Sequence, residues 1–107
     1  MEFPEIKEKL ETLGIPVAYM KFNTPQKLPF VVYREAGAVI QGADNYNLYR
    51  DVTIEILLYC ETKNVKLERN LEALFYDTEI HKSPDIYLSD ENMYEIGYSF
   101  DTIQEVE

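Results

Sequence analysis

The sequence predicts an α+β fold, a two-layer sandwich in which two helices lie on one face of a mainly antiparallel sheet. Two segments repeat apolar residues at helical spacing, residues 48–61 alternate between two sides, and short aromatic or β-branched runs separate them. Read along the chain, these segments give the order α-β-β-β-α-β-β. Residues 1–107 are predicted to form one domain, because no stretch rich in Pro, Gly or Ser divides them.

The first predicted element is an amphipathic helix over residues 3–13. Its apolar residues share one side of the helix: Phe3, Ile6, Leu10 and Leu13. Pro4 suits the first helical turn, Gly14 is a natural carboxy-terminal cap, and Pro16 prevents continuation.

Two strands are predicted next, and with the strand that follows they are expected to form a meander. The first is Val17–Phe22, and the second begins at Pro29 and runs through Tyr33. The small residues 36–38 are expected to bend or interrupt the second strand, because they pack poorly on a pleated surface. Residues 42–45 then supply turn chemistry.

The longest predicted strand covers residues 48–61 and has two unlike sides. One side is apolar and is assigned to the core: Leu48, Val52, Ile54, Ile56, Leu58 and Cys60. The other side begins polar with Tyr49, Asp51, Thr53 and Glu55, and then carries Leu57 and Tyr59. We expect another element or another subunit to cover that end.

A second helix and a closing hairpin complete the predicted fold. Residues 62–64 offer capping oxygens, and the apolar side of the helix follows: Leu67, Leu71, Leu74 and Phe75. Residues 85–88 and 93–103 are predicted strands, joined by a turn over residues 89–92.

The charge of the chain limits its partners. Ten Lys and Arg against twenty Asp and Glu give a formal net charge of −10. Tight nucleic-acid binding is not expected, because it relies on clustered basic residues, and docking on an anionic membrane is opposed by the same repulsion. The amino terminus lacks the pattern of a secretory signal and Cys60 is the only cysteine, which is typical of a protein in a reducing cytoplasm.

No group of residues indicates catalysis, a cofactor or a metal. His81 is the only histidine and falls in a predicted loop, while Cys60 lies on the core side of its strand, where a thiol acts as a small apolar group. The acidic residues of the last hairpin lack the spacing of a calcium loop: Asp85, Asp90, Glu91 and Glu95. We therefore predict a protein that is not an enzyme and needs no cofactor.

Nine tyrosines and no tryptophan favour packing at strand surfaces. Most of these tyrosines are interpreted as strand residues at the edge of the core, and the alternative is a subunit interface, where tyrosine is enriched. Tyr49, Leu57 and Tyr59 are the candidate interface residues, because all three lie on the less apolar side of the longest strand.

Four segments together resemble the tail completion proteins of long-tailed bacteriophages and prophages, also called tail terminator or head-tail joining proteins. They are LGIPVAYMKF, LPFVVYRE, GADNYNLYRDVTIEILLYCETKN and ENMYEIGYSF, and the resemblance spans roughly residues 10–100. Its motifs concern packing and turns. The fold that it implies is similar to that of the lambda tail terminator.

The resemblance implies a subunit of a hexameric ring that caps the tail tube and joins it to the DNA-filled head. Its partners would be other copies of itself, the tail tube protein and the head-tail connector protein, in a virion tail assembled in the bacterial host cytoplasm. Residues Asp44, Asn45 and Tyr46 fall in the matching hairpin loop and are candidate contacts.

A different function remains open, that of an acidic inhibitor that mimics DNA. Such a protein would display carboxylates in two rows spaced like duplex phosphates, whereas both predicted helices here interleave acids with Lys and Arg. A small enzyme is the third possibility and the least favoured.

Overall fold

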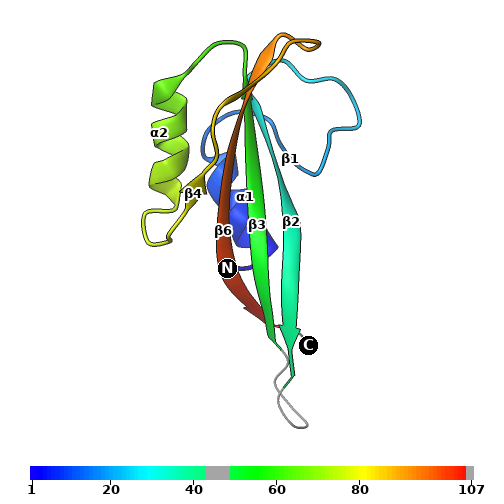
Figure 1. Ribbon diagram of the computed structural model, residues 1–107, viewed down its shortest axis with the longest axis vertical. Helices are drawn as coiled ribbons and strands as arrows, with labels where there is room; N and C mark the ends of the chain where they lie inside the picture. The colour runs from blue at the N-terminus through cyan, green and yellow to red at the C-terminus, as the bar shows by residue number, and fades with distance from the viewer. Residues whose placement is uncertain (43–48, 106–107) are drawn as a thin grey trace.

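The computed structural model describes residues 1–42 and 49–105 and confirms an α+β two-layer fold (Figure 1). In chain order its elements are α1 (Phe3–Glu11), β1 (Val17–Tyr19), β2 (Phe30–Gln41), β3 (Tyr49–Cys60), α2 (Val65–Leu74), β4 (His81–Lys82), β5 (Ile86–Leu88) and β6 (Met93–Glu105). The candidate contacts Asp44, Asn45 and Tyr46 lie outside the described residues.

The six strands form one sheet in the order β1-β2-β3-β6-β4, with β5 also paired to β6. All pairs are antiparallel except β1 with β2, where Val17 lies beside Val31 in a parallel register. The predicted meander is therefore wrong at its first step. The reason is the connection over residues 20–29, which is long enough to bring the chain back to the end of the sheet where β1 began.

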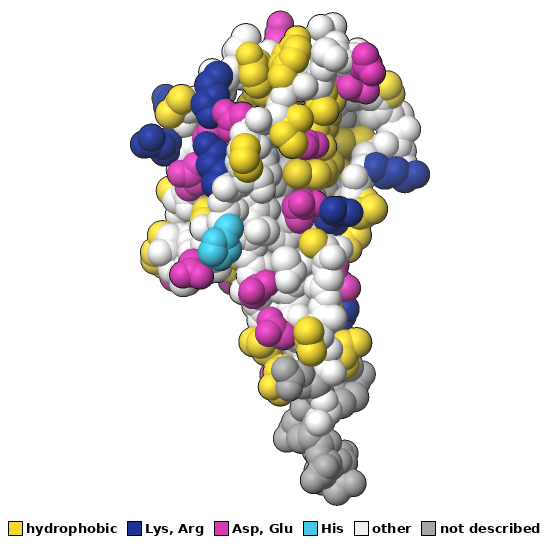
Figure 2. All heavy atoms as spheres, viewed as in Figure 1, with side chains coloured by type: hydrophobic (Ala, Val, Ile, Leu, Met, Phe, Trp, Pro, Cys, Tyr) yellow, Lys and Arg dark blue, Asp and Glu magenta, His cyan; other side chains and the backbone are white. Residues whose placement is uncertain are grey.

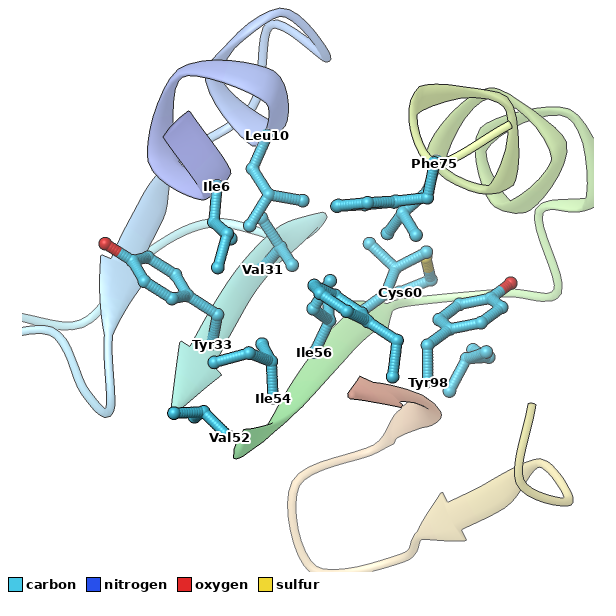
Figure 3. Packing of buried hydrophobic residues seen from close by; sticks show 14 residues of the cluster. Ile6, Leu10, Val31, Tyr33, Val52, Ile54, Ile56, Cys60, Phe75 and Tyr98 are labelled. Atoms are coloured by element: carbon cyan, nitrogen blue, oxygen red, sulfur yellow. The ribbon is translucent and has the colours of Figure 1, made fainter. Parts of the chain in front are cut away.

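Both helices pack on the same face of the sheet, as predicted. Ile6 and Leu10 of α1 are fully buried, as is Leu71 of α2, and all three belong to one core cluster with the inward residues of β2, β3 and β6. Figure 3 shows Ile6, Leu10 and Phe75 directed from the helices toward the strands. Every buried residue of β3 falls on the predicted core side: Val52, Ile54, Ile56, Leu58 and Cys60.

The helix ends follow local chemistry. Gly14 has a positive φ of 77° just after α1, a conformation that costs glycine little, and α1 ends two residues before the predicted Leu13. At the start of α2, Asn64 Oδ1 accepts a hydrogen bond from the Leu67 backbone N–H at 3.1 Å, which confirms the predicted cap.

Two irregularities shape the sheet. The register of β2 against β3 shifts between Glu35 and Gly37, so Ala36 is the extra residue of a β-bulge where small residues were expected to bend the strand. His81 was predicted in a loop, but it forms β4 with Lys82 and pairs with Ser99 of β6. A two-residue strand has no periodic pattern that a sequence could reveal.

The molecule is elongated because three strands of the sheet extend beyond both helices. The radius of gyration is 15.2 Å, against about 13 Å for a compact chain of this length, and the extents are 51 × 29 × 24 Å. The lower ends of β2, β3 and β6 extend beyond both helices in Figure 1. We call residues 38–41, 49–51 and 103–105 the arm; Val39, Ile40 and Ile103 in it are each more than half exposed.

Candidate protein interface on the open face of the sheet

The face of the sheet turned away from the helices carries the candidate interface residues. Alternation along the strands places Leu57 and Tyr59 on this outer face, next to Val32 and Phe30 of β2. Tyr49 lies on the same face but ten residues along β3 from Tyr59, which corresponds to a separation of about 33 Å. The structure therefore divides the three candidates into an upper pair and one residue on the arm.

The upper end of the outer face forms an open groove of about 620 Å³. Phe30, Val32 and Tyr59 lie along its floor, one wall is the β1–β2 connection over residues 20–26, and the other wall includes Leu88 and Met93. Hydrophobic side chains gather in this upper part of the face in Figure 2. The groove thus has an apolar floor that neither helix covers, and its rim includes the charged residues Lys21 and Glu91.

Aromatic contacts fix the shape of this groove. The Phe30 ring lies 5.1 Å from that of Tyr59 and 5.4 Å from that of Phe22, measured between centroids, and the second contact is edge-to-face. Such pairs contribute about 0.5–1.5 kcal/mol beyond the area they bury. The loop residue Phe22 is therefore held against the sheet.

The Tyr59 hydroxyl has a fixed role on this face. It donates a hydrogen bond of 2.7 Å to Glu95 Oε1 on the neighbouring strand. Burial raises the pKa of Tyr59 strongly, and the bonded Glu95 carboxylate raises it further, so the phenol stays protonated at any physiological pH. Tyr59 presents an uncharged ring to the groove.

Polar pairs occupy the middle of the outer face. Arg34 Nε donates to Glu55 Oε1 at 2.6 Å across β2 and β3, and Thr53 Oγ1 donates to Asp101 Oδ1 at 2.7 Å across β3 and β6. Below them, on the arm, the exposed Val39 and Ile103 flank Asp51. The outer face therefore has a mostly apolar upper end, a polar centre and a mixed lower end.

A second cluster, of charged residues, joins α2 to β4. Glu68 is only 2% exposed, and its Oε1 accepts from Lys63 Nζ at 2.9 Å and from Lys82 Nζ at 2.8 Å. Lys63 Nζ also donates to Asp85 Oδ2 at 2.8 Å, while Glu68 Oε2 has no hydrogen-bond partner among the described residues. Burial by itself would raise the pKa of Glu68, but the hydrogen bonds from Lys82 and Lys63 outweigh it and lower the pKa.

This cluster makes stability depend on pH. Because the folded-state pKa of Glu68 lies below its ordinary value of 4.5, its contribution is fully present above pH 4.5 and is lost as the pH falls through the lowered value. We expect Glu68→Gln to lower the free energy of unfolding at pH 7. The difference in free energy of unfolding between wild type and variant should shrink below pH 4.5. Chemical denaturation across this pH range measures this gap in free energy. Glu79→Gln, at a side chain that is 87% exposed, is the control, and a gap that stays constant in acid would contradict the assignment.

The single histidine and the single cysteine lie apart. The His81 side chain is 70% exposed, with Nε2 3.4 Å from Glu79 Oε2, whereas Cys60 is buried opposite Tyr94. Burial raises the pKa of the Cys60 thiol, and nearby Glu68 adds to the effect, so the thiolate is disfavoured. Across residues 1–42 and 49–105, no three His, Cys, Asp or Glu side chains come close enough to hold a metal ion.

Sequence reasoning missed the walls of the groove. The sequence places residues 20–22 at the end of a predicted strand, residues 23–26 in no predicted element, and Val32 in a strand without an assigned side. The alternation of β2 beside that of β3 could have placed Val32 next to Leu57, but no local pattern shows that a loop folds across the face.

Neither helix in the described part of the chain is long and apolar enough to cross a membrane. No family model matches the sequence, and no curated protein shows a significant match to it.

Proposed function

We propose that this chain is a non-catalytic structural protein of a phage-type virion, which caps the tail tube as a hexameric ring and joins the tail to the head. The observation that carries the proposal is the apolar groove on the open face of the sheet, with Phe30, Val32 and Tyr59 along its floor. The resemblance of the sequence to tail completion proteins supplies the particular role.

The chemistry of the groove suits contact with protein. Interface centres are enriched in Tyr, Phe and Met and depleted in charged residues, and this groove combines Phe22, Phe30, Tyr59 and Met93. Its protonated tyrosine and its aromatic contacts are in place without a partner, which lowers the ordering cost of association.

Charge modulates this assembly. With a net charge of −10 on each chain, like copies repel one another, and the repulsion weakens as salt screens it. Apolar contact must exceed the remaining repulsion. We therefore expect self-association to strengthen with ionic strength and to be strongest on a tube end, where a template holds the copies together.

The arrangement of acids favours this role over mimicry of DNA. Glu68 is buried, Glu55 is paired with Arg34, and Glu95 accepts from Tyr59. These three of the chain's twenty acidic residues are engaged within the fold and do not stand free in a row that a nucleic-acid enzyme could bind.

The test is to measure mass in solution by light scattering at low and high salt, and to image the protein with tail tubes by negative-stain electron microscopy. We expect rings on tube ends and a mass that rises with concentration and salt. A protein that stays monomeric in high salt and leaves tube ends bare would overturn the proposal.

A further inference from the structure

Within the described part of the chain, one edge of the sheet lacks a partner along the arm. β1 pairs with β2 only from Val31 to Tyr33, and the Tyr19 hydroxyl then accepts from the Glu35 backbone N–H at 3.1 Å. Among residues 1–42 and 49–105, nothing pairs with the outer edge of β2 beyond that point.

The bulge at Ala36 decides which backbone groups this edge presents. Before it, odd-numbered residues point outward: Val31 N–H donates to Pro16 O at 3.0 Å, and Tyr33 O accepts from Met20 N–H at 2.9 Å. The extra residue inverts the alternation, so the N–H and C=O groups of Ala38 and Ile40 point outward, while those of Val39 point toward β3.

Apart from the bulge at Ala36, this edge lacks the usual protection against pairing. Soluble proteins blunt exposed edges with Lys, Pro or a covering segment, whereas residues 36–42 carry no charge and no proline. Val39 is 60% exposed and Ile40 is 63% exposed.

The opposite edge of the arm is covered from within the chain. Met1 O accepts from Gln104 Nε2 at 3.0 Å, and Glu2 Oε2 accepts from the Glu105 backbone N–H at 3.2 Å. Only the β2 side of the arm is left for a partner, as far as the described residues show.

We propose that this edge of β2 pairs with the same edge of a second copy, in antiparallel register about a two-fold axis at Val39. Ala38 then lies opposite Ile40 of the second copy, and the outward N–H and C=O groups of these residues meet as a hydrogen-bonded pair. Val39 meets its own counterpart at the axis, and the exposed Ile40 side chain gains an apolar neighbour.

The uncharged edge suits a second copy as the occupant. Two chains that each carry a net charge of −10 repel over most of their surfaces. The segment over residues 36–42 is uncharged, so two copies can approach there with little repulsion. The pairing does not depend on the proposed ring, because a ring requires contacts between two different surfaces, whereas this edge joins like with like.

Disulfide trapping tests the register. Directly opposed residues whose backbone groups point away from each other have Cα atoms about 4.5 Å apart, within the range that a disulfide spans. Because Cys60 is buried, Val39→Cys supplies the reactive thiol, and we expect covalent dimers on mild oxidation of the concentrated protein. Ile103→Cys, at a similarly exposed residue on the same arm but two strands from this edge, is the matched control and should remain monomeric.

Two substitutions test the hydrogen bonding. Ala38→Pro removes an N–H that points outward, so the internal ladder survives, and the loss of two symmetry-related bonds should raise the dissociation constant at least about tenfold. Ile40→Lys places a charge on the edge without touching the core and should act in the same direction if the proline variant does not fold. Sedimentation measures both.

The proposal is overturned if Val39→Cys cross-links no better than Ile103→Cys, or if a folded variant of either kind associates as the wild type does. Binding to tube ends is scored separately by microscopy. A dimer without ring formation would then fault the proposed function alone, and rings without edge pairing would fault this inference alone.

Discussion

Replacing Phe75 with alanine is expected to lower the free energy of unfolding by about 3–5 kcal/mol, the usual cost of removing a buried aromatic ring. Phe75 is 1% exposed, and its ring lies 5.1 Å from that of Phe100, so it anchors the end of α2 to β6. A helix of ten residues has little stability of its own, and it depends on this contact. Because the free energy of unfolding of a small domain is only about 5–15 kcal/mol in total, the variant should lose a large share of its stability.

The neighbouring residue provides the control. Tyr76 is 85% exposed, so Tyr76→Ala removes a ring of similar size from the same segment without opening a cavity. Its expected effect is within about 0.5 kcal/mol of zero. Urea titrations followed by far-UV circular dichroism measure both variants, and equal effects would contradict the assignment of Phe75 to the core.

Replacing Tyr59 with aspartate is expected to abolish most assembly through the outer face while the chain still folds. The change removes the Phe30 contact from the groove and adds a carboxylate beside Glu95, the former acceptor of the hydroxyl. Removal of an interface anchor costs about 2 kcal/mol or more, roughly a thirty-fold loss in affinity. Tyr59 is only partly buried, so circular dichroism should show a folded protein with a lower melting temperature.

Tyr59→Phe separates the ring from its hydroxyl. It keeps the stacking on Phe30 and loses only the bond to Glu95, so its assembly on tube ends should stay close to wild type. Assembly of Tyr59→Asp at the wild-type level would remove this surface from the interface.

Local sequence patterns predicted most of the fold. Alternation along β3 identified the core side of the strand, helical spacing identified Ile6, Leu10 and Leu71, and the small residues around Ala36 marked the bulge. Each of these features arises within a few residues of the chain, where sequence and conformation are directly linked.

The parts that sequence could not supply depend on distant segments. The parallel pairing of Val17 with Val31 is set by the route of residues 20–29, and β4 exists only because β6 offers it an edge. The candidate site shows the same limit. Alternation placed Leu57 and Tyr59 on the outer face, but the groove above them is made by a loop that carries no periodic signal.

β3 runs through two environments, from a core beneath both helices to an arm beyond them. Near Leu58 its backbone hydrogen bonds are shielded by packed side chains, while near Tyr49 they are flanked by exposed residues. Local opening requires the least free energy where few apolar contacts oppose it. The strand should therefore open from the arm inward. Backbone amides near Tyr49 should exchange with solvent long before those near Leu58. A partner bound at the arm would slow the exchange of the less protected half.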